Sequence, residues 1–186
     1  MVRPGRDKLS GLVEVNETII GGEHIGKRGR GAEGKTLVLI AAEDTGSSIG
    51  RIRLSTISDA SGDVLTNTIQ QMVSIGSTIR TDGWSGYSGL SHNGYTHLPI
   101  TNNNVKESDA IQIVHRIASL LKRWLVGTHH GAINHKNLPY YLDDEFTFRF
   151  NRRTSTSRGK LFYRLIQQAL EIDPVPAKML NTTYSS

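Results

Sequence analysis

Cysteine is absent from this chain of 186 residues, and its absence removes three kinds of chemistry. The chain can form no disulfide, has no thiolate nucleophile and offers no thiolate ligand to zinc. Any metal ion must therefore be held by the side chains of Asp, Glu, Asn or His.

Long apolar runs are also missing. No stretch approaches the roughly 18 uninterrupted apolar residues that a membrane-crossing helix needs, and residues 1–6 lead into no apolar signal core. The sequence therefore predicts a soluble, cytoplasmic protein with no membrane partner. With 37% hydrophobic and 21% charged residues, the chain suits one globular domain with a core and leaves no room for a second full domain.

Positive charge is in excess and is gathered in clusters. The chain has 22 Lys and Arg against 17 Asp and Glu, a net charge of +5. This balance favours a polyanionic partner, nucleic acid first, although basic surface can also serve solubility alone. The residues expected to contact DNA are Lys27, Arg28, Arg30, Arg123, Arg149, Arg152 and Arg153.

The first third of the chain has the two-residue period of strands. Residues 12–20 alternate apolar and polar side chains, and the Gly-rich basic segment 21–34 predicts a hairpin loop before a second strand at 36–42. Residues 50–56 alternate again, so we predict a three-stranded antiparallel meander. One face of its first strand carries Leu12, Glu14, Asn16 and Thr18.

Helices and strands alternate in the rest of the chain. An amphipathic helix is predicted from Ser61 to about Gly76, followed by short strands at 77–80 and 95–100. An antiparallel run followed by alternating elements predicts an α/β fold whose sheet has mixed strand directions. The remaining helices are predicted at 109–126, 137–150 and 159–171, and Gly127 is expected to end the first of them.

The predicted domain organisation has three parts. Residues 1–10 are read as an N-terminal remnant or linker, 11–172 as one folded domain, and 173–186 as a flexible tail that begins near Pro174-Val175-Pro176.

Few residues outside these patterns suggest chemistry by themselves. Asp82 follows a short strand, where a sheet edge often meets ligands, but an Asp-Gly pair can also simply form a turn. Asn16 can face water in mid-strand, and His115 can be an ordinary surface histidine. Lys122 and Arg123 can interact only with the C-terminal dipole of their helix.

In order along the chain, four segments resemble the ISXO-type insertion-sequence transposases. They are LVEVNETIIGG (12–22), TDGWSGY (81–87), VHRIASLLKR (114–123) and YLDDEFTFRFNRR (141–153). The resemblance covers about residues 10–165. It places the chain among the DDE recombinases, and so implies a ribonuclease H-like fold and metal-dependent DNA cleavage and strand transfer.

The resemblance also implies which residues form the site. The first acidic position of the family falls at Asn16, the second at Asp82 and the variable third at His115, while Lys122 occupies the position of a lysine that contacts phosphate or supports the ligands. The implied cofactors are two Mg²⁺ or Mn²⁺ ions held by Asn16, Asp82 and His115. The implied partners are transposon-end and target DNA and further copies of the chain, acting as a homo-oligomer at the bacterial nucleoid.

Two departures from the family pattern put activity in doubt. Asn16 replaces an acidic residue, and an amide offers one neutral oxygen where a carboxylate offers two charged ones. Glu17 points to the opposite face of its strand, and Glu14 is displaced by two residues.

The zinc-binding and helix-turn-helix region usual in the family has no counterpart in the sequence. We therefore expect impaired catalysis and weak recognition of transposon ends.

Other functions remain open from the sequence. A non-catalytic basic DNA-binding module would give Asn16 and His115 no metal to bind. A degraded transposase remnant would have no selected function, and a hydrolytic nuclease would use the same ligands without strand transfer. Metal binding separates the first alternative from a transposase, and product analysis separates the last.

Overall fold

The computed structural model of the chain describes residues 7–21, 35–100, 112–129, 137–171 and 173. A five-stranded sheet forms its centre, in the order β3-β2-β1-β4-β5. The strands are β1 (Leu12–Ile20), β2 (Thr36–Asp44), β3 (Ile49–Ile57), β4 (Thr78–Asp82) and β5 (Thr96–Ile100). The first three pair antiparallel, whereas β4 pairs parallel with both β1 and β5. The predicted meander and the mixed sheet are confirmed.

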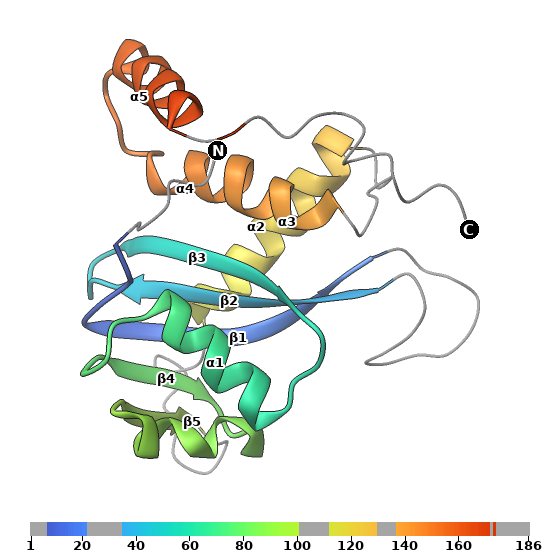
Figure 1. Cartoon of the computed structure of the whole chain (residues 1–186), viewed down its shortest axis with the longest axis vertical. Coiled ribbons are helices and arrows are strands. Elements are labelled where there is room, and N and C mark those ends of the chain that lie inside the picture. The colour runs from blue at the N-terminus through green and yellow to red at the C-terminus, as the bar shows by residue number, and fades with distance from the viewer. Residues whose placement is uncertain (1–6, 22–34, 101–111, 130–136, 172, 174–186) are drawn as a thin grey trace.

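Helices cover both faces of this sheet (Figure 1). The helical elements are α1 (Gly62–Met72), η1 (Ser85–Asn93), α2 (Gln112–His129), α3 (Leu138–Tyr140), η4 (Tyr141–Thr147), α4 (Phe148–Asn151) and α5 (Arg158–Leu170). Helix α1 lies on one face, and α2 lies on the other together with the run from α3 to α4. In the described part of the chain, no helix is both long enough and apolar enough to span a membrane.

Two helix ends differ from the predictions. Helix α1 stops at Met72, before the expected Gly76, because Val73 forms a parallel bridge with Leu9 and so leaves the helical path. Helix α2 runs past Gly127 to His129, so the prediction that this glycine ends the helix is wrong. A single glycine costs a helix only about 1 kcal/mol, and packing of the apolar face offsets that cost. Residues 109–111 of the predicted helix lie outside the described residues.

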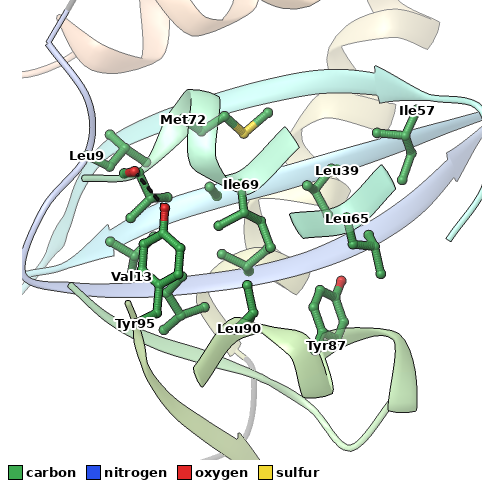
Figure 2. Packing of buried hydrophobic residues seen from close by; sticks show 14 of the residues in the cluster. Leu9, Val13, Leu39, Ile57, Leu65, Ile69, Met72, Tyr87, Leu90 and Tyr95 are labelled. Atoms are coloured by element: carbon green, nitrogen blue, oxygen red, sulfur yellow. Dashed lines mark hydrogen bonds between the residues drawn. The ribbon is translucent and has the colours of Figure 1, made fainter. Parts of the chain in front are cut away.

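The first core packs α1 and η1 against one face of the sheet (Figure 2). Helix α1 contributes Leu65 and Ile69, one helical turn apart, and η1 contributes Tyr87 and Leu90. The short 3₁₀ element η1 was not predicted, because its Ser- and Gly-rich sequence has no helical periodicity. The cluster also holds Leu9, Val13, Val15, Leu39, Ala41, Ile57, Ala60, Met72, Val73, Ile79 and Tyr95.

The second core lies between the other face of the sheet and helices α2 to α4. Strand β2 is apolar throughout its middle because it contributes to both cores, with Leu39 facing α1 and Ile40 facing α2. Along α2, the buried residues Val114, Ile117, Leu121 and Leu125 follow the helical period. From α3 to α4, the buried residues recur every fourth position at Leu138, Leu142, Phe146 and Phe150. The π-helical turns of η4 keep these positions on one face, where a regular α-helix would let them drift around its axis.

The folded unit includes Leu9, which lies before the boundary expected at residue 11. Its side chain is fully buried in the first core, its N–H donates to the carbonyl of Met72 at 2.8 Å, and its carbonyl accepts from Ser74 at 2.8 Å. The segment before β1 is therefore part of the packed structure.

Truncation of Leu9 tests this boundary. We expect Leu9→Ala to lower the free energy of unfolding by about 2–5 kcal/mol, as for other buried leucines, because it leaves a cavity beside Val73. Leu98→Ala is the matched control, since Leu98 is half exposed on β5, and its effect should stay within about 0.5 kcal/mol. Urea denaturation of both variants measures the difference; equal and small effects would place Leu9 outside the cooperative unit.

Candidate active site

Asn16 lies on the face of β1 that is covered by α2. Its neighbours Val13 and Val15 belong to the opposite core, and Asn16 is only 8% exposed. Its Oδ1 accepts a hydrogen bond from the backbone N–H of Glu17 at 2.8 Å. The interpretation that Asn16 faces water is therefore wrong, because the covering helix removes that side of the strand from solvent.

The parallel pairing of β1 with β4 ends two residues before Asn16 and Asp82. Glu14 pairs with Arg80, and Asn16 and Asp82, the last residue of β4, each follow two residues later on their adjacent strands. Neighbouring strands lie about 4.8 Å apart, and residues two apart on a strand share a face. Asp82 also serves the turn that the sequence allowed, because its Oδ1 accepts the backbone N–H of Trp84 at 3.0 Å.

A buried ion network lies directly before these two positions. Glu14 is fully buried, and its Oε2 accepts from Nη2 of Arg80 at 3.0 Å. The same Nη2 donates to Oδ2 of Asp44 at 2.5 Å. The other oxygen of Glu14, Oε1, accepts the backbone N–H of Val114 at 2.8 Å. One carboxylate thus connects β1 and β4 to the first turn of α2, and Arg80 extends the connection to the end of β2.

The pKa values of the network follow from these contacts. Burial lowers the pKa of Arg80, but the hydrogen bond to Asp44 and the charge of Glu14 outweigh it, so the pKa is raised. Burial raises the pKa of Asp44, but the N–H of Gly46 and the guanidinium of Arg80 outweigh it, so that pKa is lowered. Both groups are therefore held in their charged forms.

The bond from Val114 to Glu14 fixes where α2 begins over the sheet. His115 follows Val114 directly, and His115 and Lys122 are both exposed on α2. The hydroxyl of Ser119 donates to the carbonyl of His115 at 2.9 Å, which leaves the imidazole out of that bond. The assignment of His115 as a ligand and of Lys122 as a phosphate contact stays a prediction.

Glu17 faces away from this site. Its carboxylate accepts the hydroxyl of Tyr87 at 2.7 Å, and Tyr87 is buried in the first core, on the α1 side of the sheet. This agrees with the alternation of side chains along β1.

Two of the predicted DNA-contacting arginines are bound within the protein. The guanidinium of Arg153 donates to the carbonyls of Ile49, Gly50 and Phe150 and lies 4.1 Å from the centre of the Phe150 ring. Arg152 lies 4.0 Å from the centre of the Phe148 ring. These contacts join the end of α4 to the start of β3, a role that the basic cluster in the sequence did not suggest.

Of the other residues predicted to contact DNA, two are exposed on helices and three lie outside the described residues. Arg149 is exposed and pairs with Glu145 one helical turn earlier, at 2.9 Å. Arg123 is exposed on α2. Lys27, Arg28 and Arg30 lie outside the described residues.

Arg80 and Asp44 were not among the predicted site residues. Arg80 lies two residues before Asp82, where alternation places it on the same face, but Asp44 is the last residue of β2, on the other side of β1. Only the order of strands in the sheet brings these two side chains together.

Comparisons with known proteins show the family and the fold. Residues 8–151 match the family model described as ISXO2-like transposase domain. The chain belongs to this transposase family. A search among curated proteins gives no match. Among solved structures, the transposase domain is similar to the catalytic core domain of BIV integrase, with a TM-score of 0.51 and 14% identity over 87% of this chain and 97% of that chain. That likeness shows the ribonuclease H-like fold.

The donor atoms of the transposase domain do not fit two divalent ions. Mg²⁺ and Mn²⁺ prefer carboxylate oxygens, and of the three implied ligands only Asp82 has a carboxylate. Asn16 offers a neutral amide oxygen and His115 an imidazole nitrogen. Within the described ranges, no three His, Asp or Glu side chains are grouped so that they could hold a metal ion. A single carboxylate leaves most of the charge of two such ions uncompensated.

Acid should weaken the transposase domain through Asp44. Because its folded pKa is lowered, the stability it contributes is present above the unfolded pKa of about 3.9 and is lost as the pH falls through the folded pKa. We expect Asp44→Asn to reduce the free energy of unfolding by about 1–2 kcal/mol at neutral pH and to flatten its decline below about pH 4. Denaturation of the parent and the variant between pH 2 and 7 measures the free energy of unfolding and its decline in acid. An equal decline below about pH 4 in the two proteins would contradict the role given to Asp44.

Arg153 should act on stability and Arg123 on DNA binding. We expect Arg153→Ala to lower the free energy of unfolding by about 1–2 kcal/mol, because three carbonyls and the Phe150 ring lose a partner. Arg123→Ala, on the exposed side of α2, is the matched control and should change stability by less than about 0.5 kcal/mol. Thermal melts of both variants measure the two losses of stability. A larger loss in Arg123→Ala than in Arg153→Ala would contradict the structural role of Arg153.

Proposed function

We propose that this domain derives from a DNA strand transferase and that Asn16 impairs metal-dependent DNA cleavage and strand transfer in this chain. The observation that carries the proposal is the strand register, in which Asn16 and Asp82 each lie two residues beyond the paired Glu14 and Arg80, on adjacent strands and on one face. That position suits a shared metal ligand. An amide there keeps the shape of the side chain and removes its charge.

The missing charge is the physical reason for impairment. Two-metal phosphoryl transfer needs ions about 3.5–4 Å apart, and carboxylates that bridge them offset their mutual repulsion. The amide of Asn16 has one neutral oxygen, and that oxygen already accepts the N–H of Glu17. Binding of a second ion is therefore expected to be weak.

Neighbouring carboxylates are poorly suited to replace the missing one. Both oxygens of Glu14 are engaged, one by Arg80 and the other by the N–H of Val114. Releasing Glu14 to a metal would leave Arg80 partly buried with one partner fewer, which is costly. Glu17 is bonded to Tyr87 on the far side of the sheet.

The remaining assignments form part of the same proposal. Asp82 would hold a divalent ion with His115, and Lys122 would contact a DNA phosphate. Arg123 and Arg149 would bind the DNA backbone, with the basic residues Lys27, Arg28 and Arg30. The substrate would be transposon-end and target DNA, and the acting form a homo-oligomer.

Restoring the carboxylate is the direct test. We expect Asn16→Asp to bind Mn²⁺ in calorimetry with a short DNA duplex present, and to raise strand transfer at least about 100-fold over the parent chain, since metal ions contribute several kcal/mol to such reactions. Asn67→Asp is the matched control: Asn67 is exposed on α1, on the other face of the sheet, so the same chemical change should alter neither quantity.

The outcomes separate the candidate functions. Metal binding only by Asn16→Asp supports a transposase centre disabled at one residue. Strand transfer by the parent chain at the level of Asn16→Asp contradicts impairment. DNA binding without metal binding in either protein favours the non-catalytic DNA-binding module.

A further inference from the structure

Trp84 is held in one orientation beside the candidate active site. Its backbone N–H donates to Oδ1 of Asp82 at 3.0 Å, and its indole Nε1 donates to the carbonyl of Ala60 at 3.1 Å. The indole also passes so close to Gly86 that a Cβ atom there would lie 2.5 Å from Nε1. Trp84 is nevertheless 42% exposed. An aromatic side chain that is both fixed and exposed is suited to bind a ligand, because little conformational freedom is lost on binding.

Trp84 lines an open cavity of about 570 Å³ at one end of the sheet. Ile19, Leu37 and Ile57 form apolar parts of its wall. They lie near the end of β1, the start of β2 and the end of β3, and the strand directions bring these points to the same end of the sheet as Asp82. The volume falls within the range of about 300–1,000 Å³ that is usual for ligand sites.

The cavity suits a flat, neutral group with a polar edge. Among the described residues, its charged lining consists of Lys35 and Asp59, whose charges cancel, so no net positive charge draws a phosphate inside. Asp59 is also engaged within the protein, because it accepts the N–H of Ser61 at 2.8 Å and the hydroxyl of Ser58 at 2.9 Å. The apolar wall and the indole can contact a planar ring, and the hydroxyl of Ser61 can bond to the edge of that ring.

We propose that this cavity receives one unpaired nucleobase of the DNA substrate, which stacks on the indole of Trp84. The inference rests on the proposed function, because it takes the DNA to be bound at Asp82. Two residues along a chain span at most about 7 Å, and nucleotides along one strand lie about 3.4 Å apart. The stacked base therefore belongs to a nucleotide within a few steps of the phosphate at Asp82.

Stacking on Trp84 selects the state of the DNA more than its sequence. Every base has a π-face, so an aromatic platform tolerates all four bases, but a base must leave its pair and its neighbours before it can enter a cavity. The site should therefore favour DNA with an unpaired base over fully paired DNA.

Binding of short DNA duplexes by the full parent chain, without added metal ion, tests the proposal. One duplex carries a single unpaired thymine, a second has an abasic sugar in its place, and a third is fully paired. We expect the parent chain to bind the first duplex at least about fivefold more tightly than the second, because the abasic sugar has no ring to stack.

Tryptophan fluorescence reports on the contact itself. The chain has two tryptophans, so Trp124→Phe leaves Trp84 as the only indole. The duplex with the unpaired thymine should quench the fluorescence of this variant, and the abasic duplex should quench it much less.

Substitutions at the platform should change the preference for the unpaired thymine over the abasic sugar. Trp84→Ala should reduce this ratio of affinities to about one, whereas Trp84→Phe, which keeps a ring, should retain most of it. Gly86→Ala keeps the indole but displaces it, so it should also lower the ratio. Tyr163→Ala is the matched control: Tyr163 is 65% exposed on α5, which packs on the helices of the other face, and its loss should leave the ratio unchanged.

The outcomes separate this inference from the proposed function. No binding of any duplex would overturn both. Equal affinity for the thymine and abasic duplexes, or a preference that survives Trp84→Ala, would overturn the nucleobase site alone and leave the cavity to an apolar peptide of a partner protein. Because no metal ion is added, a failure of Asn16→Asp to bind Mn²⁺ does not affect these measurements.

Discussion

The buried carboxylate of Glu14 holds together the part of the molecule on which the site depends. It has no access to solvent, and its two oxygens join Arg80 of β4 and the backbone of α2. An uncompensated charge at this depth would cost several kcal/mol, so the Arg80 guanidinium must lie beside Glu14. The level of β4 relative to β1, and the point at which α2 starts, follow from this requirement.

This network adjoins the buried side chain of Asn16 on the same strand face. Glu14, two residues before it, is already paired with Arg80, and the Asn16 amide adds no charge to this part of the interior. Under the proposed function, stability and metal binding place opposite requirements on this position, because a buried carboxylate there would need a cation to offset its charge.

The basic residues show a similar division of roles. Arg153 closes the end of α4 onto β3 through backbone carbonyls, although its sequence context resembles that of a phosphate-binding cluster. Arg80 neutralises two carboxylates in the interior. The number of Lys and Arg residues thus overstates the positive charge available to DNA, because some of these residues balance groups within the fold.

The sequence by itself determined most of the regular elements and the family. The alternation along residues 12–20, the apolar period of α2 and the ordered motifs were sufficient to predict the mixed sheet, the transposase family and the candidate positions Asn16 and Asp82. The periodic patterns are local, since each arises from residues a few positions apart, and the order of the motifs is read directly along the chain.

Only the tertiary structure decided the contacts between distant segments. The register that pairs Glu14 with Arg80, the burial of Asn16 beneath α2 and the pairing of Arg80 with Asp44 depend on which strands become neighbours. The bridge from Leu9 to Val73, which ends α1 early, has the same origin. Periodicity specifies the face on which a side chain lies, but the partner on that face is fixed by the free energy of the whole packed sheet.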